Sequence, residues 1–175
     1  THNSITDSYL LSREAAKSFL EYNTQIGSLA AVKARDGRVY DMGGAIGIVS
    51  IAYALISRKP IVLVDKSQEE LVYARDLIKQ MKLEQLVEVV QDKAENVVAE
   101  RGLNSNDLVI FAEPNSSLRK FWRHVAQHYS SSLILAGNLN PDLKTSYQFL
   151  TLEQAKPKLI EFAERYLIPK GFDVE

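Results

Sequence analysis

The sequence alternates between short apolar runs and longer segments of helical periodicity, and this alternation limits the chain to few folds. Five runs have the length and composition of buried strands: Val39–Met42, Ile61–Val64, Leu86–Val90, Leu108–Phe111 and Leu133–Leu135. The clearest helical segment between them is Gln68–Met81, where Ser67 and Glu70 form a capping box. Strands that alternate with helices predict an α/β fold, a doubly wound and mainly parallel sheet with helices on both faces.

Helices are also expected before the first strand and after the fourth strand. Residues 1–35 are predicted to form a helical N-terminal segment, with one helix over Arg13–Tyr22, capped by Ser12, and a second near Ile26–Lys33. After the fourth strand, one of two adjacent serines is expected to cap another helix. The capping candidates are Ser116 and Ser117, and the helix is Leu118–Tyr129.

A cluster of glycines follows the first expected strand. The chain there runs Asp41-Met42-Gly43-Gly44-Ala45-Ile46-Gly47 and continues into an apolar helix. Glycines permit positive φ and let the backbone approach a ligand, and the next helix offers free N–H groups at its N-terminus. A dinucleotide-binding corner needs a small residue where this chain has Ile48, so an NAD-dependent oxidoreductase is disfavoured. For the glycines alone, a plain strand-to-helix corner with packing glycines is the alternative.

The corner resembles the first motif of class I S-adenosylmethionine-dependent methyltransferases, in which an acidic and an apolar residue precede Gly-x-Gly-x-Gly. Asp41, Met42, Gly43, Ala45 and Gly47 occupy the motif positions. Ala45 replaces the middle glycine, and its methyl group can fit if the local backbone avoids positive φ. The resemblance covers roughly residues 38–139. It implies that the corner cradles the amino-acid part of S-adenosyl-L-methionine and that Asp41 orients the ammonium group of this cofactor.

The resemblance implies further cofactor contacts at the ends of later strands. Asp65 ends the second strand, where the family has an acidic residue that accepts hydrogen bonds from both ribose hydroxyls. The family's acidic residue near the adenine amino group aligns with Lys93, which cannot accept a hydrogen bond. Either Asp92 takes this role, or backbone and apolar groups hold adenine. The implied cofactor-binding set is Asp41, Gly43, Gly44, Ala45, Gly47, Asp65, Lys66, Asp92, Lys93, Ala94 and Ala112.

Glu113 follows the fourth strand, where the family lines the opening at which the methyl group meets its acceptor. Members that methylate amino groups often carry an Asn/Asp-Pro-Pro-aromatic tetrapeptide there, and this chain has Glu113-Pro114-Asn115-Ser116 instead. Glu113 is the candidate catalytic residue, as a general base or as an anchor for a substrate ammonium group. The alternative is a solvated acid at the end of a strand.

The segment between the fourth and fifth strands combines cationic and aromatic residues. Arg119, Lys120 and Arg123 share it with Trp122. We interpret the cations as a solvated helix face rather than a nucleic-acid site, because the net charge of the chain is −1. Two histidines four residues apart in the same segment have no third metal ligand beside them, so no metal site is expected.

The 175 residues fit a single methyltransferase-like domain, with a Rossmann-like core over residues 36–175. Pro157–Leu167 is expected to be a helix and Phe172–Glu175 to begin a sixth strand, which leaves no residues for the family's seventh. A homo-oligomer or a partner subunit would then cover the open sheet edge. The chain has no cysteine, no signal-peptide pattern and no apolar run long enough to span a membrane, so we expect it in the cytoplasm.

The residues and the resemblance together predict a methyltransferase that uses S-adenosyl-L-methionine. The reaction is an in-line displacement at the sulfonium carbon, for which the cofactor brings the electrophile. The methyl acceptor is not identified by the sequence, and a nucleic-acid acceptor is disfavoured but left open. The alternative is a non-catalytic or partner-dependent methyltransferase-like domain of a larger protein or complex, as Ala45 and Lys93 would suggest.

Overall fold

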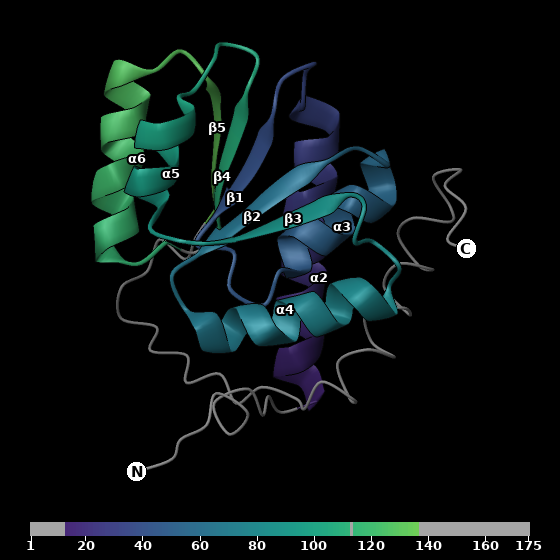
Figure 1. Ribbon diagram of the computed structural model, residues 1–175. Helices are drawn as coiled ribbons and strands as arrows, with labels where there is room; N and C mark the ends of the chain where they lie inside the picture. Colours follow the sequence, from purple (N-terminus) through teal and green to yellow (C-terminus); the bar gives the residue numbers. More distant parts are fainter. Residues whose placement is uncertain (1–12, 113, 137–175) are drawn as a thin grey trace.

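The computed structural model describes residues 13–112 and 114–136, which form a five-stranded sheet with helices between the strands (Figure 1). The elements are α2 (Arg13–Lys33), β1 (Val39–Met42), α3 (Ile48–Ser57), β2 (Ile61–Asp65), α4 (Gln68–Gln80), β3 (Val87–Gln91), α5 (Ala94–Arg101), β4 (Leu108–Ala112), α6 (Ser116–His128) and β5 (Ser132–Ala136). The strand order is β3-β2-β1-β4-β5, and every neighbouring pair is parallel. The predicted doubly wound α/β fold is confirmed.

Two hydrophobic cores cover the two faces of the sheet. Alternate residues of each strand point to opposite faces, so Val39 joins the core under α2, α3 and α4, while Tyr40 joins the core under α5 and α6. Figure 1 shows the same division, with α5 and α6 together on one side of the sheet. All residues of β1 and β2 are buried, because both strands lie inside the sheet and are covered on both faces.

The N-terminal segment differs from the prediction of two helices. One helix, α2, runs from Arg13 to Lys33, and it packs along α3. Gly27 lies so close to α3 that an added Cβ would come within 2.7 Å of the Ala52 Cβ. Asn23 and Thr24, which separated the two predicted helices, are buried in this contact region at 8% and 4% exposure. Tertiary packing therefore overrides a local sequence that favours a break.

The helix caps were partly predicted. The Ser67 hydroxyl accepts a hydrogen bond from the Glu70 backbone N–H at 3.3 Å, which confirms Ser67 as the cap of α4. The prediction for α6 was wrong by one or two residues, because the cap is Asn115, whose Oδ1 accepts from the Leu118 N–H at 3.0 Å. The predicted cap Ser12 and the predictions for Pro157–Leu167 and Phe172–Glu175 lie outside the described residues.

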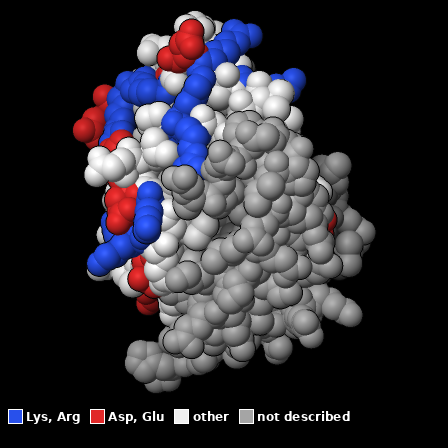
Figure 2. Space-filling view, turned by 90° about the vertical axis from the view of Figure 1, so that its right-hand side faces the viewer, with Lys and Arg blue, Asp and Glu red and all other residues white. Residues whose placement is uncertain are grey.

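Surface charges and helix lengths add two further observations. On the described part of the face drawn in Figure 2, basic and acidic side chains lie side by side, so this area carries both signs of charge. Among the helices of the described ranges, none combines the length and the apolar character needed to cross a membrane.

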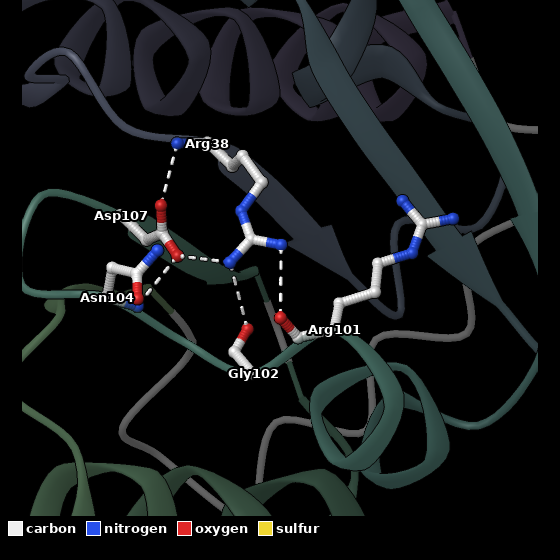
Figure 3. Close-up of polar contacts among 5 residues, drawn as sticks. All are labelled: Arg38, Arg101, Gly102, Asn104 and Asp107. Atoms are coloured by element: carbon white, nitrogen blue, oxygen red, sulfur yellow. Dashed lines mark hydrogen bonds and ion pairs between the residues drawn. The ribbon is translucent and has the colours of Figure 1, made fainter.

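A buried carboxylate at the amino ends of the strands joins three segments (Figure 3). Asp107, whose side chain is 1% exposed, accepts from the Arg38 N–H at 2.8 Å and from the Arg38 guanidinium at 3.0 Å. The Asn104 N–H donates to the same carboxylate at 2.8 Å. Arg38 also donates to the carbonyl oxygens of Arg101 and Gly102 at the end of α5. The turn before β4 and the start of β1 are thus fixed to each other.

Replacing Asp107 with asparagine is expected to lower the free energy of unfolding by about 3 kcal/mol, because it removes charge-assisted bonds from a buried site. Each carboxylate oxygen faces an N–H donor, so either orientation of the new amide sets its NH₂ group against a donor. Urea unfolding measures the difference. The matched control is Glu88→Ala, which removes the exposed ion pair between Glu88 and Arg101. Glu88 is 54% exposed, so this control should cost less than about 1 kcal/mol.

An equal and small loss in both variants would contradict the importance of the buried pair.

Candidate functional site

A cavity of about 510 Å³ opens at the carboxyl ends of β1, β2 and β3. Its walls are the turns after these strands and the start of α6, so it lies where the strand order reverses between β1 and β4. This is the place where open α/β sheets bind ligands. Its volume falls within the range of roughly 300–1,000 Å³ that is usual for small-molecule sites.

A larger cavity of about 910 Å³ lies at the opposite, amino ends of the strands. Arg38 and Asp107 contribute to its wall, but they are already paired with each other in the contact of Figure 3. The volume of a cavity alone therefore does not identify the functional site. Position in the fold favours the smaller cavity, because the helix N-termini and strand ends that bind ligands in such sheets surround it.

The structure brings together seven of the residues predicted to bind a cofactor. The residues that line the smaller cavity are Gly43, Ala45, Asp65, Lys66, Asp92, Lys93 and Ala94. Four others, Asp41, Gly44, Gly47 and Ala112, do not line it. The predicted catalytic residue, Glu113, lies outside the described residues.

Sequence reasoning missed the contribution of the first turns of three helices. Glu70 of α4 and Glu95 of α5 line the cavity, as do Asn115, Ser117 and Leu118 at the start of α6. The available signal was positional, since each of these residues follows shortly after the end of a strand in the sequence. The N-caps of α4, α5 and α6 all open onto the cavity, so their positive dipole ends face it.

The glycine corner adopts left-handed backbone conformations at three positions. Gly43 has φ 72° and Gly47 has φ 83°, a region that favours glycine. Ala45 has φ 51°, so the condition that the sequence analysis set for this alanine, a backbone without positive φ, is not met. The compensating contact is a hydrogen bond of 2.9 Å from the Ala45 N–H to Asp65 Oδ2. An alanine in this conformation costs about 1 kcal/mol, which one charge-assisted hydrogen bond can offset.

The remaining glycine of the corner is needed for packing. A Cβ on Gly44 would collide with the Leu63 side chain and lie 2.6 Å from Asp41 Oδ2. A Cβ on Gly43 would meet the end of the Leu118 side chain, which is flexible. The alternative of packing glycines therefore holds for Gly44, whereas Gly43 lines the cavity.

Asp65 connects the corner to the start of α4. Its Oδ2 accepts from the Ala45 N–H, and its Oδ1 accepts from the Ser67 N–H at 2.8 Å. The residue is only 9% exposed and lines the cavity. A carboxylate oxygen can accept more than one hydrogen bond, so Asp65 keeps acceptor capacity for a ligand.

Asp41 is buried beneath the corner. Its side chain is fully buried, and Oδ2 accepts from the Ser50 hydroxyl at 2.7 Å, while Oδ1 has no hydrogen-bond partner among the residues that the structure describes. Burial raises the pKa of the Asp41 carboxyl to about 6 from the ordinary 3.8. The hydrogen bond from Ser50 opposes this rise, and the negative charge of Asp65 adds to it.

Replacing Asp41 with asparagine tests this burial through the pH dependence of stability. When the native chain unfolds, the carboxyl regains its lower pKa, so the native state becomes less stable as the pH rises through both values. A rise of about two units corresponds to about 3 kcal/mol lost between roughly pH 4 and pH 6.5. The stability of Asp41→Asn should not decline in this way as the pH rises. Urea unfolding across that pH range measures the difference from the native chain.

The control is Asp76→Asn, because Asp76 is exposed and its replacement should leave the native pH dependence in place. Parallel curves for Asp41→Asn and the native chain would show that Asp41 carries no such penalty.

Comparisons with known proteins give matches to solved structures alone. No family model matches the chain, and no curated protein matches its sequence. A precorrin-6Y C5,15-methyltransferase from Geobacter metallireducens has a TM-score of 0.52 and 19% identity, over 81% of this chain and 70% of that chain. A protein from Klebsiella pneumoniae titled "putative O-methyltransferase" has a TM-score of 0.54 and 15% identity, over 79% and 66%.

A third structure, a "putative transferase" from Pyrococcus horikoshii, has a TM-score of 0.56 and 14% identity, over 89% of this chain and 55% of that chain. The chain thus spans between 55% and 70% of these three proteins. At these identities the likeness concerns the fold. Together with the parallel order β3-β2-β1-β4-β5, it shows that the chain has the fold of class I S-adenosylmethionine-dependent methyltransferases.

Proposed function

We propose that the chain binds S-adenosyl-L-methionine in the cavity at the ends of β1, β2 and β3 and transfers its methyl group to an acceptor. The observation that carries this proposal is the placement of Asp65, which lines one cavity together with Ala45 and Asp92. These three residues come from three separate turns. The fold also supports S-adenosyl-L-methionine as the ligand of this cavity, since two of the matched structures are described as methyltransferases.

The residues of the cavity fit the cofactor. Asp65 offers two acceptor oxygens, as the two neighbouring hydroxyls of a ribose require. At the end of β3, Asp92 Oδ1 accepts from the Lys93 N–H and the Asn96 side chain, both at 2.7 Å. Asp92 Oδ2 makes no hydrogen bond within the described part of the chain. This free acceptor supports Asp92 rather than Lys93 as the residue that accepts a hydrogen bond from the adenine amino group.

The charge of the cavity also fits a cationic ligand. The ionisable residues in its wall are Asp65, Glu70, Asp92, Glu95, Lys66 and Lys93. Four carboxylates thus face two ammonium groups. S-adenosylmethionine carries a sulfonium and an ammonium against one carboxylate, so its net positive charge suits an acidic cavity.

Asp41 does not line the cavity, but its Oδ1 is an acceptor under the glycine corner that is unpartnered within the described residues. The cofactor supplies the electrophilic methyl group, so the chain has to bind, orient and exclude water. Asp65 and the corner fix the position of the nucleoside and amino-acid parts. A protonated acceptor also needs a base, and the sequence assigns that role to Glu113 at the end of β4.

Asp65→Asn is expected to weaken S-adenosylmethionine binding about ten- to a hundredfold, because a charge-assisted hydrogen bond contributes roughly 1.5–3 kcal/mol. Titration calorimetry measures the affinity, with S-adenosylhomocysteine and NAD as further ligands. NAD should not bind. Since Asp65 also accepts from the Ala45 and Ser67 N–H groups, the melting temperature of the variant has to be recorded alongside.

The matched control is Asp76→Asn, an exposed carboxylate on α4 away from the cavity, which should bind the cofactor like the native chain. A folded Asp65→Asn variant with native affinity would remove Asp65 from the site. A native chain that binds neither S-adenosylmethionine nor S-adenosylhomocysteine would overturn the proposed function as a whole.

Glu113→Gln keeps the shape of the side chain and removes the base. It is expected to lower turnover by about a hundred- to ten-thousandfold while the affinity for S-adenosylmethionine stays unchanged. The measurement is methyl transfer to an acceptor found by screening. Native turnover in the variant would identify Glu113 as a solvated acid at the end of the strand.

A further inference from the structure

A second cavity at the carboxyl ends of the strands has a volume of about 340 Å³ and lies beside the proposed cofactor site. Pro114, after β4, lines this second cavity, while the next residue, Asn115, lines the first. Leu135 and Ala136 at the carboxyl end of β5 form another part of its wall. Both cavities therefore open at the same end of the sheet and are separated by one turn of the chain.

The charged residues in the wall of this cavity are two arginines of α6. Arg119 and Arg123 line it, and the described residues of the wall include no carboxylate. The Arg119 Nε donates to the Pro114 carbonyl oxygen at 3.1 Å, which holds its guanidinium beside the cavity. Neither arginine forms an ion pair within residues 20–112 and 114–136. Like charges four residues apart on a helix repel each other, so the helix gains no stability from this pair alone.

Aromatic side chains supply the rest of the wall. Tyr22 of α2 and Trp122 of α6 line the cavity from opposite layers of the fold. The Trp122 Nε1–H is buried and has no hydrogen-bond partner within residues 13–112 and 114–136. Aromatic side chains and two guanidinium groups together suit a planar molecule with an anionic oxygen group.

We propose that this cavity binds the methyl acceptor and that Arg119 and Arg123 select an acceptor with a planar ring and a carboxylate or phosphate group. The proposal rests on the proposed function and names the substrate class of the same site. The sequence-based interpretation of these two arginines as a solvated helix face agrees with their exposure, and the proposal adds a ligand to this face. Lys120, between them, lines a different cavity on the other side of α6.

The single tryptophan of the chain reports directly on this cavity. Benzoate and phenyl phosphate are the probes for the two anionic groups, and phenol and benzylamine are the neutral and cationic comparisons. In the native chain at constant ionic strength, both anions should change the Trp122 fluorescence in a saturable way, whereas phenol and benzylamine should not. The anion that binds more tightly identifies carboxylate or phosphate as the preferred group.

Arg123→Gln is expected to weaken binding of the tighter anion at least about tenfold, since a charge-assisted hydrogen bond contributes roughly 1.5–3 kcal/mol. Arg123→Lys should bind with intermediate affinity, because lysine keeps the charge and loses the paired donors of the guanidinium. Lys120→Gln is the matched control. It removes a neighbouring charge from the same helix and should bind the anion within about twofold of the native chain.

Equal fluorescence changes with benzoate, phenyl phosphate and phenol, or native anion affinity in Arg123→Gln, would overturn the proposal. Calorimetry with S-adenosylmethionine separates this failure from that of the proposed function. A chain that binds the cofactor but no anion refutes the acceptor class alone. A chain that binds the anions but not the cofactor refutes the proposed function and leaves an anion-binding cavity.

Discussion

The carboxylate of Asp65 joins the two turns from which the candidate site is built. It accepts hydrogen bonds from the N–H groups of Ala45 in the glycine corner and Ser67 at the start of α4. The carbonyl oxygen of Val64 accepts from the Gly43 N–H at 2.8 Å, so the corner is held against the end of β2 by side chain and backbone together. These hydrogen bonds together hold the backbone of Ala45 in its left-handed conformation. The shape of the cavity and the local stability of the fold thus depend on one buried group.

The order and type of the elements could be predicted because each strand is a short apolar run and each central helix has a periodic apolar face. The bounds of β1 were predicted without error, and those of the other strands within one residue. The continuity of α2 could not be predicted, since it depends on the close approach of Gly27 to α3, a contact between segments far apart in the sequence. The cap of α6 was missed because Asn115 and the two serines after it are all good capping residues. Only the extended backbone of Asn115 decides among them.

The candidate site was predictable where it depends on position along the chain. Asp65 and Asp92 end or follow strands, and parallel strands bring such residues to one edge of the sheet. The role of each glycine was not predictable, because spacing does not tell whether a missing side chain makes room for a ligand or for a neighbour. The structure shows that Gly44 makes room for Leu63. The pairing of Arg38 with Asp107 was equally hidden, since 69 positions separate them and a buried aspartate resembles any turn residue in sequence.

The charges of the two neighbouring cavities constrain the chemistry that the fold can host. An anionic acceptor next to the first cavity would be repelled by its four carboxylates, because charges within about 10 Å of each other are only partly screened. Arg119 and Arg123 lie on the far side of the Pro114–Asn115 turn, where they can compensate this repulsion and hold an anionic group away from the acidic wall. A cationic donor and an anionic acceptor would then attract each other across the turn. The charges of the two cavities would thereby favour binding of the cationic donor in the first cavity and of the anionic acceptor in the second. Each would bind less well in the cavity of the other.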